Sequence, residues 1–433
     1  MKQSKVSQWL GNTNSKLFSI WVIVAAFSTY FCMYAFRKPI TVGSYEGVFF
    51  LGMGLKTVLI ISQTIGYTLS KFAGIKFISE MRGGYRALAI LSLIGVAEFA
   101  LLGFATVPVS LKGACLFFNG LMLGMIWGLV FSFIEGRKTT ELLGAGLSVS
   151  FVVASGWTKS AGIKIMELGV PEYWMPFATG LAFTLPLIFF VWMLSQIPPP
   201  SAEDEAERTK REPMDFTTRL KFFKTFALGL VLLVIVYMFL TAFRDFRDNF
   251  MPDILKEQGV VDVLDFGMIE TYVALSLLGI VAGTMLIKNH MLAFIINHIL
   301  IIVGFLTVGV ATWLFQSEHI SANIWMVLTG IGGYMGYIPF NCILFERLIA
   351  TFKCVSNAGF LIYVADAFGY LAAVGIMFYQ AFFTSTTTWT GFFIQISWIM
   401  VVLGVILTCG SLAYFINKKR TSIDGNNLGL RIK

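Results

Sequence analysis

Two arginines stand at the same place in two related stretches of apolar sequence. YFCMYAFR ends at Arg37, and YMFLTAFR, in the second half of the chain, ends at Arg244. Tyrosine, alanine, phenylalanine and arginine recur at the same four positions, so Tyr30 and Tyr237 precede their arginines by the same interval. That interval is about two helical turns, which puts each tyrosine on the same helix face as its arginine.

The guanidinium group determines which chemistry this pair could perform. It is always charged and grips a carboxylate or phosphate through two parallel hydrogen bonds. In hydrocarbon it costs from ~3 to more than ~10 kcal/mol, so it persists only at a polar cavity or near the headgroups. The matched register of Arg37 and Arg244 favours a shared cavity that binds an anion, with two interfacial arginines as the alternative. Tyr30 and Tyr237 could donate hydrogen bonds to that anion or simply pack.

Other ionisable side chains fall inside apolar segments, where each needs a partner or water. We expect Lys56 and Asp366 to pair as a gate or as a proton-responsive link, and Asp366 and Glu98 to be candidate proton carriers. Lys159 lies among small residues in ASGWTKSAGIK. It either faces the ligand or extends outward to the membrane surface.

The composition is that of an integral membrane protein. The chain has 433 residues, 57% hydrophobic and 13% charged, with a mean hydropathy of +0.78. A spanning helix needs about 20 apolar residues. We therefore predict an all-α membrane protein with twelve transmembrane helices, near residues 17–38, 50–72, 87–107, 112–134, 142–166, 174–195, 224–248, 266–287, 291–314, 323–345, 357–380 and 389–415.

One long polar, Pro-flanked segment divides these helices into two sets of six. We assign residues 1–196 to an N-terminal six-helix half, 197–223 to a cytoplasmic linker, and 224–433 to a C-terminal half with a short cytoplasmic tail. Asn119-Gly120 and Thr329-Gly330 recur at a similar offset to the two arginines, which indicates related halves. Parallel repeats of six spans are the pattern of a 6+6 pseudo-symmetric major-facilitator-type bundle, whose site lies between the halves.

Lysine and arginine concentrate in the loops on the side of the N-terminus. By the positive-inside rule, both termini are predicted to be cytoplasmic, in the cell inner membrane. The net charge of +8 is therefore explained by topology, and no nucleic-acid partner is needed.

Three short stretches carry a resemblance to a known family. MYAFRKP, GYTLSKFAGIK and the Pro252 to Glu257 segment after Arg244 resemble the organophosphate:phosphate antiporters of the major facilitator superfamily, in a separate bacterial branch. The resemblance implies that Arg37 and Arg244 form an anion clamp and that Lys71 is a secondary basic group. It also implies alternating access, in which the two halves rock about the site.

Several classes of function find no support in the sequence. No Walker motif, HExxH motif or nucleophile elbow occurs, so we expect no enzyme activity, and we expect no cofactor or metal site. The five cysteines include no CxxC pair. We predict a secondary transporter of a small anionic solute carrying a phosphate or carboxylate group, monomeric in the lipid bilayer, with exchange and proton coupling both open. The alternative is a non-transporting receptor on a transporter scaffold.

Overall fold

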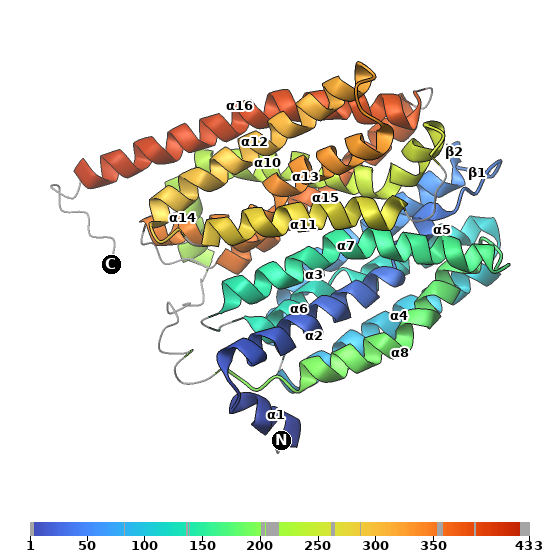
Figure 1. Ribbon diagram of the computed structural model, residues 1–433, viewed down its shortest axis with the longest axis horizontal. Coiled ribbons are helices and arrows are strands. Elements are labelled where there is room, and N and C mark those ends of the chain that lie inside the picture. The colour runs from blue at the N-terminus through green and yellow to red at the C-terminus, as the bar shows by residue number, and fades with distance from the viewer. Residues whose placement is uncertain are drawn as a thin grey trace.

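The computed structural model describes residues 4–81, 83–135, 137, 139–200, 204, 216–260, 265–285, 287–352, 358–384 and 387–424. Long helices run side by side in one bundle (Figure 1). The N-terminal half contains α1 (Lys5–Gly11), α2 (Ser15–Ala35), α3 (Leu55–Glu80), α4 (Arg86–Thr106), α5 (Val109–Leu123), α6 (Ile126–Ile134), α7 (Thr140–Glu167) and α8 (Met175–Ser195), with short 3-10 turns at Pro39–Val42 and Gly83–Tyr85.

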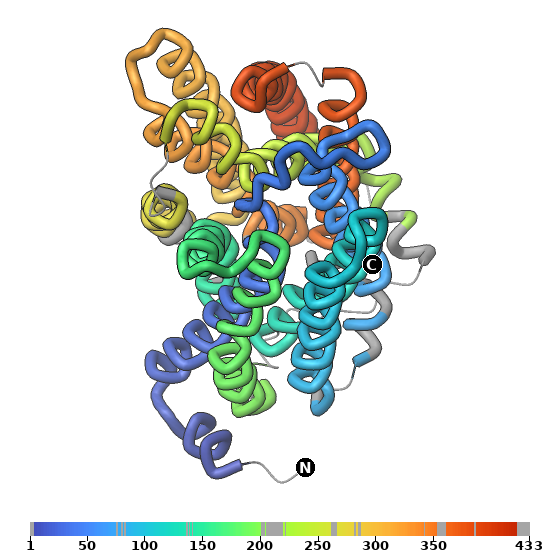
Figure 2. The backbone as a smooth tube through the Cα atoms, turned by 90° about the vertical axis from the view of Figure 1, so that its right-hand side faces the viewer, coloured from blue at the N-terminus to red at the C-terminus, as the bar shows by residue number. Residues whose placement is uncertain are grey.

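The C-terminal half contains α10 (Phe216–Glu257), α11 (Asp265–Met285), α12 (His290–Gln316), α13 (Ala322–Cys342), α14 (Leu344–Phe352), α15 (Ala358–Phe383) and α16 (Trp389–Asp424). Figure 2 shows the helices of the two halves largely grouped on opposite sides of the molecule. The halves meet where α3 packs against α15 and α7 packs against α11. Most of the predicted linker, 197–223, lies outside the described residues, and the division into halves stays a prediction.

All twelve predicted spans coincide with helices, and the all-α fold is confirmed. Two of the spans are broken. The fourth divides into α5 and α6 at Gly124, which packs against Ser70 and the Tyr67 carbonyl. The tenth divides into α13 and α14, which meet at 44° just after Pro339, a residue that cannot donate a helical hydrogen bond.

Eight stretches of the described chain are long and apolar enough to cross a membrane, one of them running through both α5 and α6, or nine if α13 and α14 are one span. α3, α7 and α11 are not among them, although all three were predicted as spans. All three carry polar residues that face the protein interior: Gln63 and Lys71 in α3, Lys159 in α7 and Glu270 in α11. The lower mean hydropathy of these helices therefore comes from polar side chains that are buried inside the bundle.

A small hairpin precedes α3 and marks one end of the bundle. β1 (Phe49–Phe50) pairs antiparallel with β2 (Met53–Gly54) across a turn in which Leu51 and Gly52 have positive φ. This turn fits the right-handed twist of a hairpin. Because the hairpin occupies residues 49–54, α3 starts at Leu55 and not near residue 50, where the span was predicted to begin. We call this end the hairpin face, at the right of Figure 1, and the opposite end, where α16 terminates, the terminal face.

The closest helix packing in the N-terminal half depends on glycines. A Cβ atom on Gly120 of α5 would lie 2.0 Å from the Gln63 carbonyl oxygen, and one on Gly66 of α3 would lie 2.0 Å from the Phe117 carbonyl oxygen. Small residues that let two backbones approach are typical of membrane helix interfaces. This contact holds α3, and with it Gln63 and Lys71, at a fixed distance from α5.

Gly120→Ala should therefore destabilise the protein. The clash is with backbone atoms that have no rotamer to change, so the loss should reach or exceed the upper end of the ~1–3 kcal/mol typical of overpacking. Gly95→Ala in α4 is the control, because a Cβ there meets no atom within 4 Å. Thermal unfolding of the purified protein measures both variants, and equal melting temperatures would contradict the packing described.

Candidate functional site

Arg37 lies just beyond the end of α2, on backbone that neighbouring helices hold in place. The helix ends at Ala35 with Phe36 as its C-cap, and a short 3-10 turn follows from Pro39. Backbone carbonyl groups just after the helix accept hydrogen bonds from side chains of neighbouring helices. Asn119 Nδ2 donates to the Phe36 carbonyl oxygen at 3.0 Å, and Gln63 Nε2 donates to that of Arg37 at 3.2 Å. The Arg37 backbone is thus attached to both α3 and α5.

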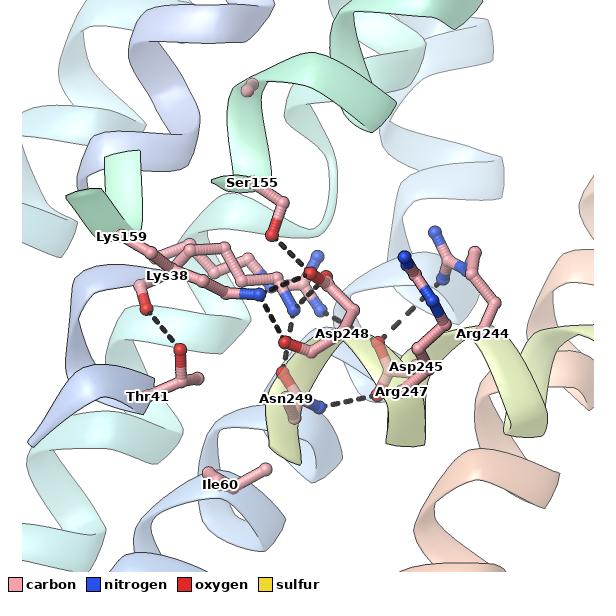
Figure 3. Close-up of polar contacts among 12 residues, drawn as sticks. Lys38, Thr41, Ile60, Ser155, Lys159, Arg244, Asp245, Arg247, Asp248 and Asn249 are labelled. Atoms are coloured by element: carbon pink, nitrogen blue, oxygen red, sulfur yellow. Dashed lines mark hydrogen bonds and ion pairs between the residues drawn. The ribbon is translucent and has the colours of Figure 1, made fainter. Parts of the chain in front are cut away.

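The two arginines approach one carboxylate from opposite halves of the protein. Arg37 Nη2 lies 3.9 Å from Asp245 Oδ1, and Arg244 Nη2 lies 3.8 Å from the same oxygen. The side chains of Arg37 and Arg244 are only 3% and 6% exposed. The structure therefore places both guanidinium groups inside the bundle, and the interfacial alternative is wrong. Figure 3 shows Arg244 beside Asp245 on α10.

Tyrosine rings form the walls around these guanidinium groups. Arg37 lies 3.8 Å from the ring centroid of Tyr67, and Arg244 lies 4.5 Å from that of Tyr337. Tyr370 of α15 lies within 6 Å of both arginines, and Arg244 Nη2 donates to its hydroxyl at 3.2 Å. Cation–π contacts of this kind stabilise a desolvated guanidinium group while leaving its N–H donors available to other partners.

A cavity of about 20 Å³ lies beside Arg244 at the contact between the halves. That volume holds about one water molecule. In this conformation the two halves are therefore closed about the arginines. The cavity is lined by Tyr30, Tyr34, Lys71, Trp127, Phe151, Arg244, Tyr337, Asn341, Asp366 and Tyr370.

Two other predicted site residues, Lys71 and Tyr237, contact Asp366. Lys71 Nζ lies 2.7 Å from Asp366 Oδ2, and the Tyr237 hydroxyl donates to Asp366 Oδ1 at 2.9 Å. The Tyr30 hydroxyl lies 3.5 Å from that of Tyr67. Tyr30, Lys71 and Asp366 line the cavity together, and Tyr237 is held against its wall. Lys71 therefore neutralises a carboxylate of the other half.

The predicted pair of Lys56 and Asp366 is wrong. Lys56 Nζ lies 2.8 Å from Asp253 Oδ1, near the hairpin face. Lys56 belongs to the first turn of α3 and Lys71 to a turn about 22 Å further along it, at a rise of 1.5 Å per residue. Asp366 lies level with Lys71, so Lys56 is too far along the helix to reach it.

A second buried cluster gathers around Asp248, one turn after Asp245 on α10. Asp248 Oδ2 lies 2.5 Å from Lys38 Nζ, and its Oδ1 lies 2.7 Å from Lys159 Nζ. Ser155 also donates to this carboxylate, and Lys159 also donates to the Asp248 carbonyl. Lys159 is fully buried and paired with the other half, so it does not extend outward to the membrane surface, and its predicted ligand-facing role stays a prediction. Figure 3 shows Lys38 and Ser155 pointing toward Asp248.

Asn249 joins the two clusters into one network. Its Oδ1 accepts a hydrogen bond from Lys38 Nζ at 2.7 Å, and its Nδ2 donates to Asp245 Oδ2 at 3.0 Å. Asp245 thus has one carboxylate oxygen held by Asn249 and the other directed at the arginines. The next arginine, Arg247, is bonded inside its own half, to Glu270 Oε1 at 2.8 Å and to the Met326 carbonyl.

The buried charges are divided by sign between the two halves. In the buried ion pairs that cross between the halves, the N-terminal half supplies the base and the C-terminal half supplies the acid. We call these residues the interface array. Its bases are Arg37, Lys38, Lys56, Lys71 and Lys159, and its acids are Asp245, Asp248, Asp253 and Asp366.

The hairpin face carries one pair with the opposite arrangement. Glu46, in the loop before the hairpin, lies 2.6 Å from Lys256 Nζ at the end of α10, and both side chains are more than two-thirds exposed. The hydrogen bond from Lys256 lowers the pKa of the Glu46 carboxyl. Together with Lys56 and Asp253, this pair links the halves at the hairpin face.

Glu98 stands apart from the interface array. Within the described part of the chain, neither of its carboxylate oxygens has a hydrogen-bond partner, and both are buried. A Cβ atom on Gly180 of α8 would lie 2.2 Å from Glu98 Oε2, so the carboxylate packs against that helix. The structure thus does not bring Glu98 to the cavity, and its role as a proton carrier stays a prediction.

Asp245 and Asp248 were missed at the sequence level, although a signal was present. FRDFRDN, from Phe243 to Asn249, repeats arginine and aspartate at a spacing of three residues inside an apolar segment. That spacing puts the two aspartates on neighbouring faces one turn apart. Such a repeat indicates that a span carries its own counter-charges.

Comparison with known proteins identifies the family and the fold. A family model described as "Family of unknown function (DUF5690)" matches residues 39–418. The chain belongs to this family. No curated protein sequence matches it.

Solved structures of transporters share its architecture. A D-xylose-proton symporter superposes with a TM-score of 0.61 at 18% identity, covering 92% of this chain and 97% of that one. A bacterial homolog of the human lysosomal transporter Spinster gives 0.58 at 13% identity, covering 95% and 99%. The human organic anion transporter MFSD10 gives 0.55 at 13% identity, covering 90% and 99%. The predicted major facilitator fold is therefore confirmed, and this DUF5690 chain is a multi-pass membrane protein. The likeness to organophosphate antiporters stays a prediction.

The Asp248 cluster should contribute strongly to stability. Asp248→Asn leaves Lys38 and Lys159 buried without a counter-charge, and removing one partner of a buried ion pair costs about 3–5 kcal/mol. Adding Lys159→Met to that variant should recover part of the loss. The control is Glu167→Gln, whose partner Lys164 is exposed, and which should leave the melting temperature unchanged. Thermal unfolding gives the melting temperatures of the wild type and the three variants. If Asp248→Asn had the same melting temperature as the wild type, the stabilising role of the cluster would be refuted.

Proposed function

We propose that this DUF5690 protein is a secondary transporter of a small anionic solute. It works by alternating access between the half at residues 1–196 and the half at 224–433. Both termini lie in the cytoplasm, and the protein acts as a monomer in the cell inner membrane. The solute carries a phosphate or carboxylate group that Arg37 and Arg244 bind together.

One observation carries this proposal. Arg37 and Arg244 come from matching positions of the two halves, and both lie within 4 Å of a single carboxylate oxygen. The space between them thus already accommodates an anionic oxygen. An anion bound there would touch both halves at once, as a solute must if its binding is to be coupled to their relative movement.

The surrounding residues suit a compact, partly polar solute. Lys71 and Asp366 would place one charge of each sign at the cavity, and the hydroxyls of Tyr30, Tyr34, Tyr337 and Tyr370 line it. A solute with a hydroxylated body and an anionic group would find partners for both parts. Of the similar structures, the symporter takes D-xylose with protons and MFSD10 is an organic anion transporter. These two functions, transport of a sugar and of organic anions, support a small organic solute.

The ion pairs between the halves supply contacts that must separate during the cycle. Lys56 with Asp253 and Glu46 with Lys256 join the halves near the hairpin face. Opening that face toward the outside requires both pairs to part, while the pair formed by Lys71 of α3 and Asp366 of α15 lies deeper in the bundle. Solute access from the hairpin side is therefore closed in this conformation.

Arginine substitutions test the proposal in reconstituted vesicles. Uptake of inorganic phosphate, glycerol 3-phosphate, succinate and gluconate is measured for the wild type, Arg37→Lys, Arg244→Lys and Arg420→Lys. The lysine variants keep the charge but lose the bidentate fork. A hydrogen bond to a charged group contributes about 1.5–3 kcal/mol, so each should lower kcat/KM roughly 10- to 100-fold for the transported anion.

Arg420→Lys is the matched control, because Arg420 is exposed on α16. It should transport as the wild type does. D-xylose is included as a neutral solute. If neither arginine substitution alters the uptake of any anion, or if only D-xylose is transported, the anionic solute is ruled out.

A further inference from the structure

Asp245 occupies the place between the two arginines where a bound anion would lie. Its Oδ1 is the atom that approaches both guanidinium groups, at 3.9 Å from Arg37 and 3.8 Å from Arg244. Asn249 holds the other oxygen, so the carboxylate has a defined orientation. The side chain of Asp245 is 2% exposed, which makes it a counter-charge in the same dry environment as the arginines.

The contact of Arg37 with Asp245 crosses between the halves, and it forms where they are closed. The cavity beside Arg244 measures only about 20 Å³. Two buried guanidinium groups that approach without a counter-charge repel one another, and each also loses its hydration. The closed packing around Arg37 and Arg244 is therefore reached with a carboxylate that belongs to the chain itself.

The same geometry leaves this carboxylate easy to displace. Strong charge-assisted hydrogen bonds between nitrogen and oxygen are about 2.7–2.9 Å long. Both distances to Asp245 are about 1 Å longer, whereas Lys71 with Asp366 and Lys38 with Asp248 are within 2.7 Å. A free anion with two or three oxygens could bind the arginines at shorter range than Asp245 does.

We propose that Asp245 is a built-in anion that lets the two halves close about Arg37 and Arg244 with no solute bound. This inference rests on the proposed function. A carrier whose arginines lacked such a group could close only when loaded, and would be restricted to exchange of one anion for another. With Asp245 in place, the unloaded carrier completes its cycle, so this protein can move its solute in one direction as well.

Closure is measured on the full chain by double electron–electron resonance between paired spin labels. One pair sits at Leu168 and Ser317 near the hairpin face, and the other at Lys16 and Lys288 near the terminal face, all exposed positions. The five native cysteines are replaced in every variant. The variants are compared in chloride buffer with and without inorganic phosphate.

In chloride alone, the wild type should keep the distances that this structure has for both label pairs, with the hairpin face closed. Asp245→Asn should lose most of this closed population at one face, because two arginines then share no counter-charge. The double variant Asp245→Asn with Arg37→Gln should regain the closed population, since only one of the two arginines is left. Glu167→Gln, an exposed acid changed in the same way, should behave as the wild type does. Phosphate should restore closure in Asp245→Asn.

Two results would overturn the inference. One is that Asp245→Asn closes as well as the wild type in chloride; the other is that the double variant fails to regain closure. If Asp245→Asn does not fold, closure of the double variant in chloride decides the matter alone. If the double variant closes while phosphate has no effect on Asp245→Asn, Asp245 is the counter-charge, and phosphate binding by the arginines is refuted separately.

Discussion

The cost of burying charge between two helical halves is the constraint on which this structure depends. A lysine or arginine inside a membrane protein loses its hydration, and the loss is recovered only through close counter-charges and hydrogen bonds. Arg37, Lys38, Lys71 and Lys159 are buried in the N-terminal half, and their counter-charges lie in the C-terminal half. Each half therefore depends on the other to neutralise its interior. The pairing holds the halves together and also limits the ways in which they can separate.

This arrangement suits the alternating access that we propose, in which the halves move without coming apart. The base positions on α3 lie at two levels, with Lys56 near the hairpin face and Lys71 about 22 Å deeper. A rocking movement can separate the outer pair while the deeper pair still holds. The Asp248 cluster is tighter, with two lysines and a serine on one carboxylate. It lies next to the arginines and is well placed to act as the pivot of such a movement.

The sequence predicted features that depend on periodicity and missed those that depend on pairing between distant helices. A helix lies at each of the twelve predicted spans, and nine of these spans are apolar enough to be recognised by hydropathy alone. The convergence of Arg37 and Arg244 followed from a repeated octapeptide, since equal register in related halves means equal depth. By contrast, the partner of Lys56 depends on how far along α3 each residue lies relative to α10 and α15. The breaks at Gly124 and near Pro339 also depend on local packing that hydropathy does not register.

The central claim is that one anion binds between Arg37 and Arg244 and takes the place of Asp245. An experimental structure of the full chain with tungstate, an electron-dense analogue of phosphate, tests it most directly. We expect tungstate density within hydrogen-bonding distance of both guanidinium groups, with the Asp245 carboxylate turned away from them. Tungstate bound elsewhere, with Asp245 still between the two arginines, would contradict it.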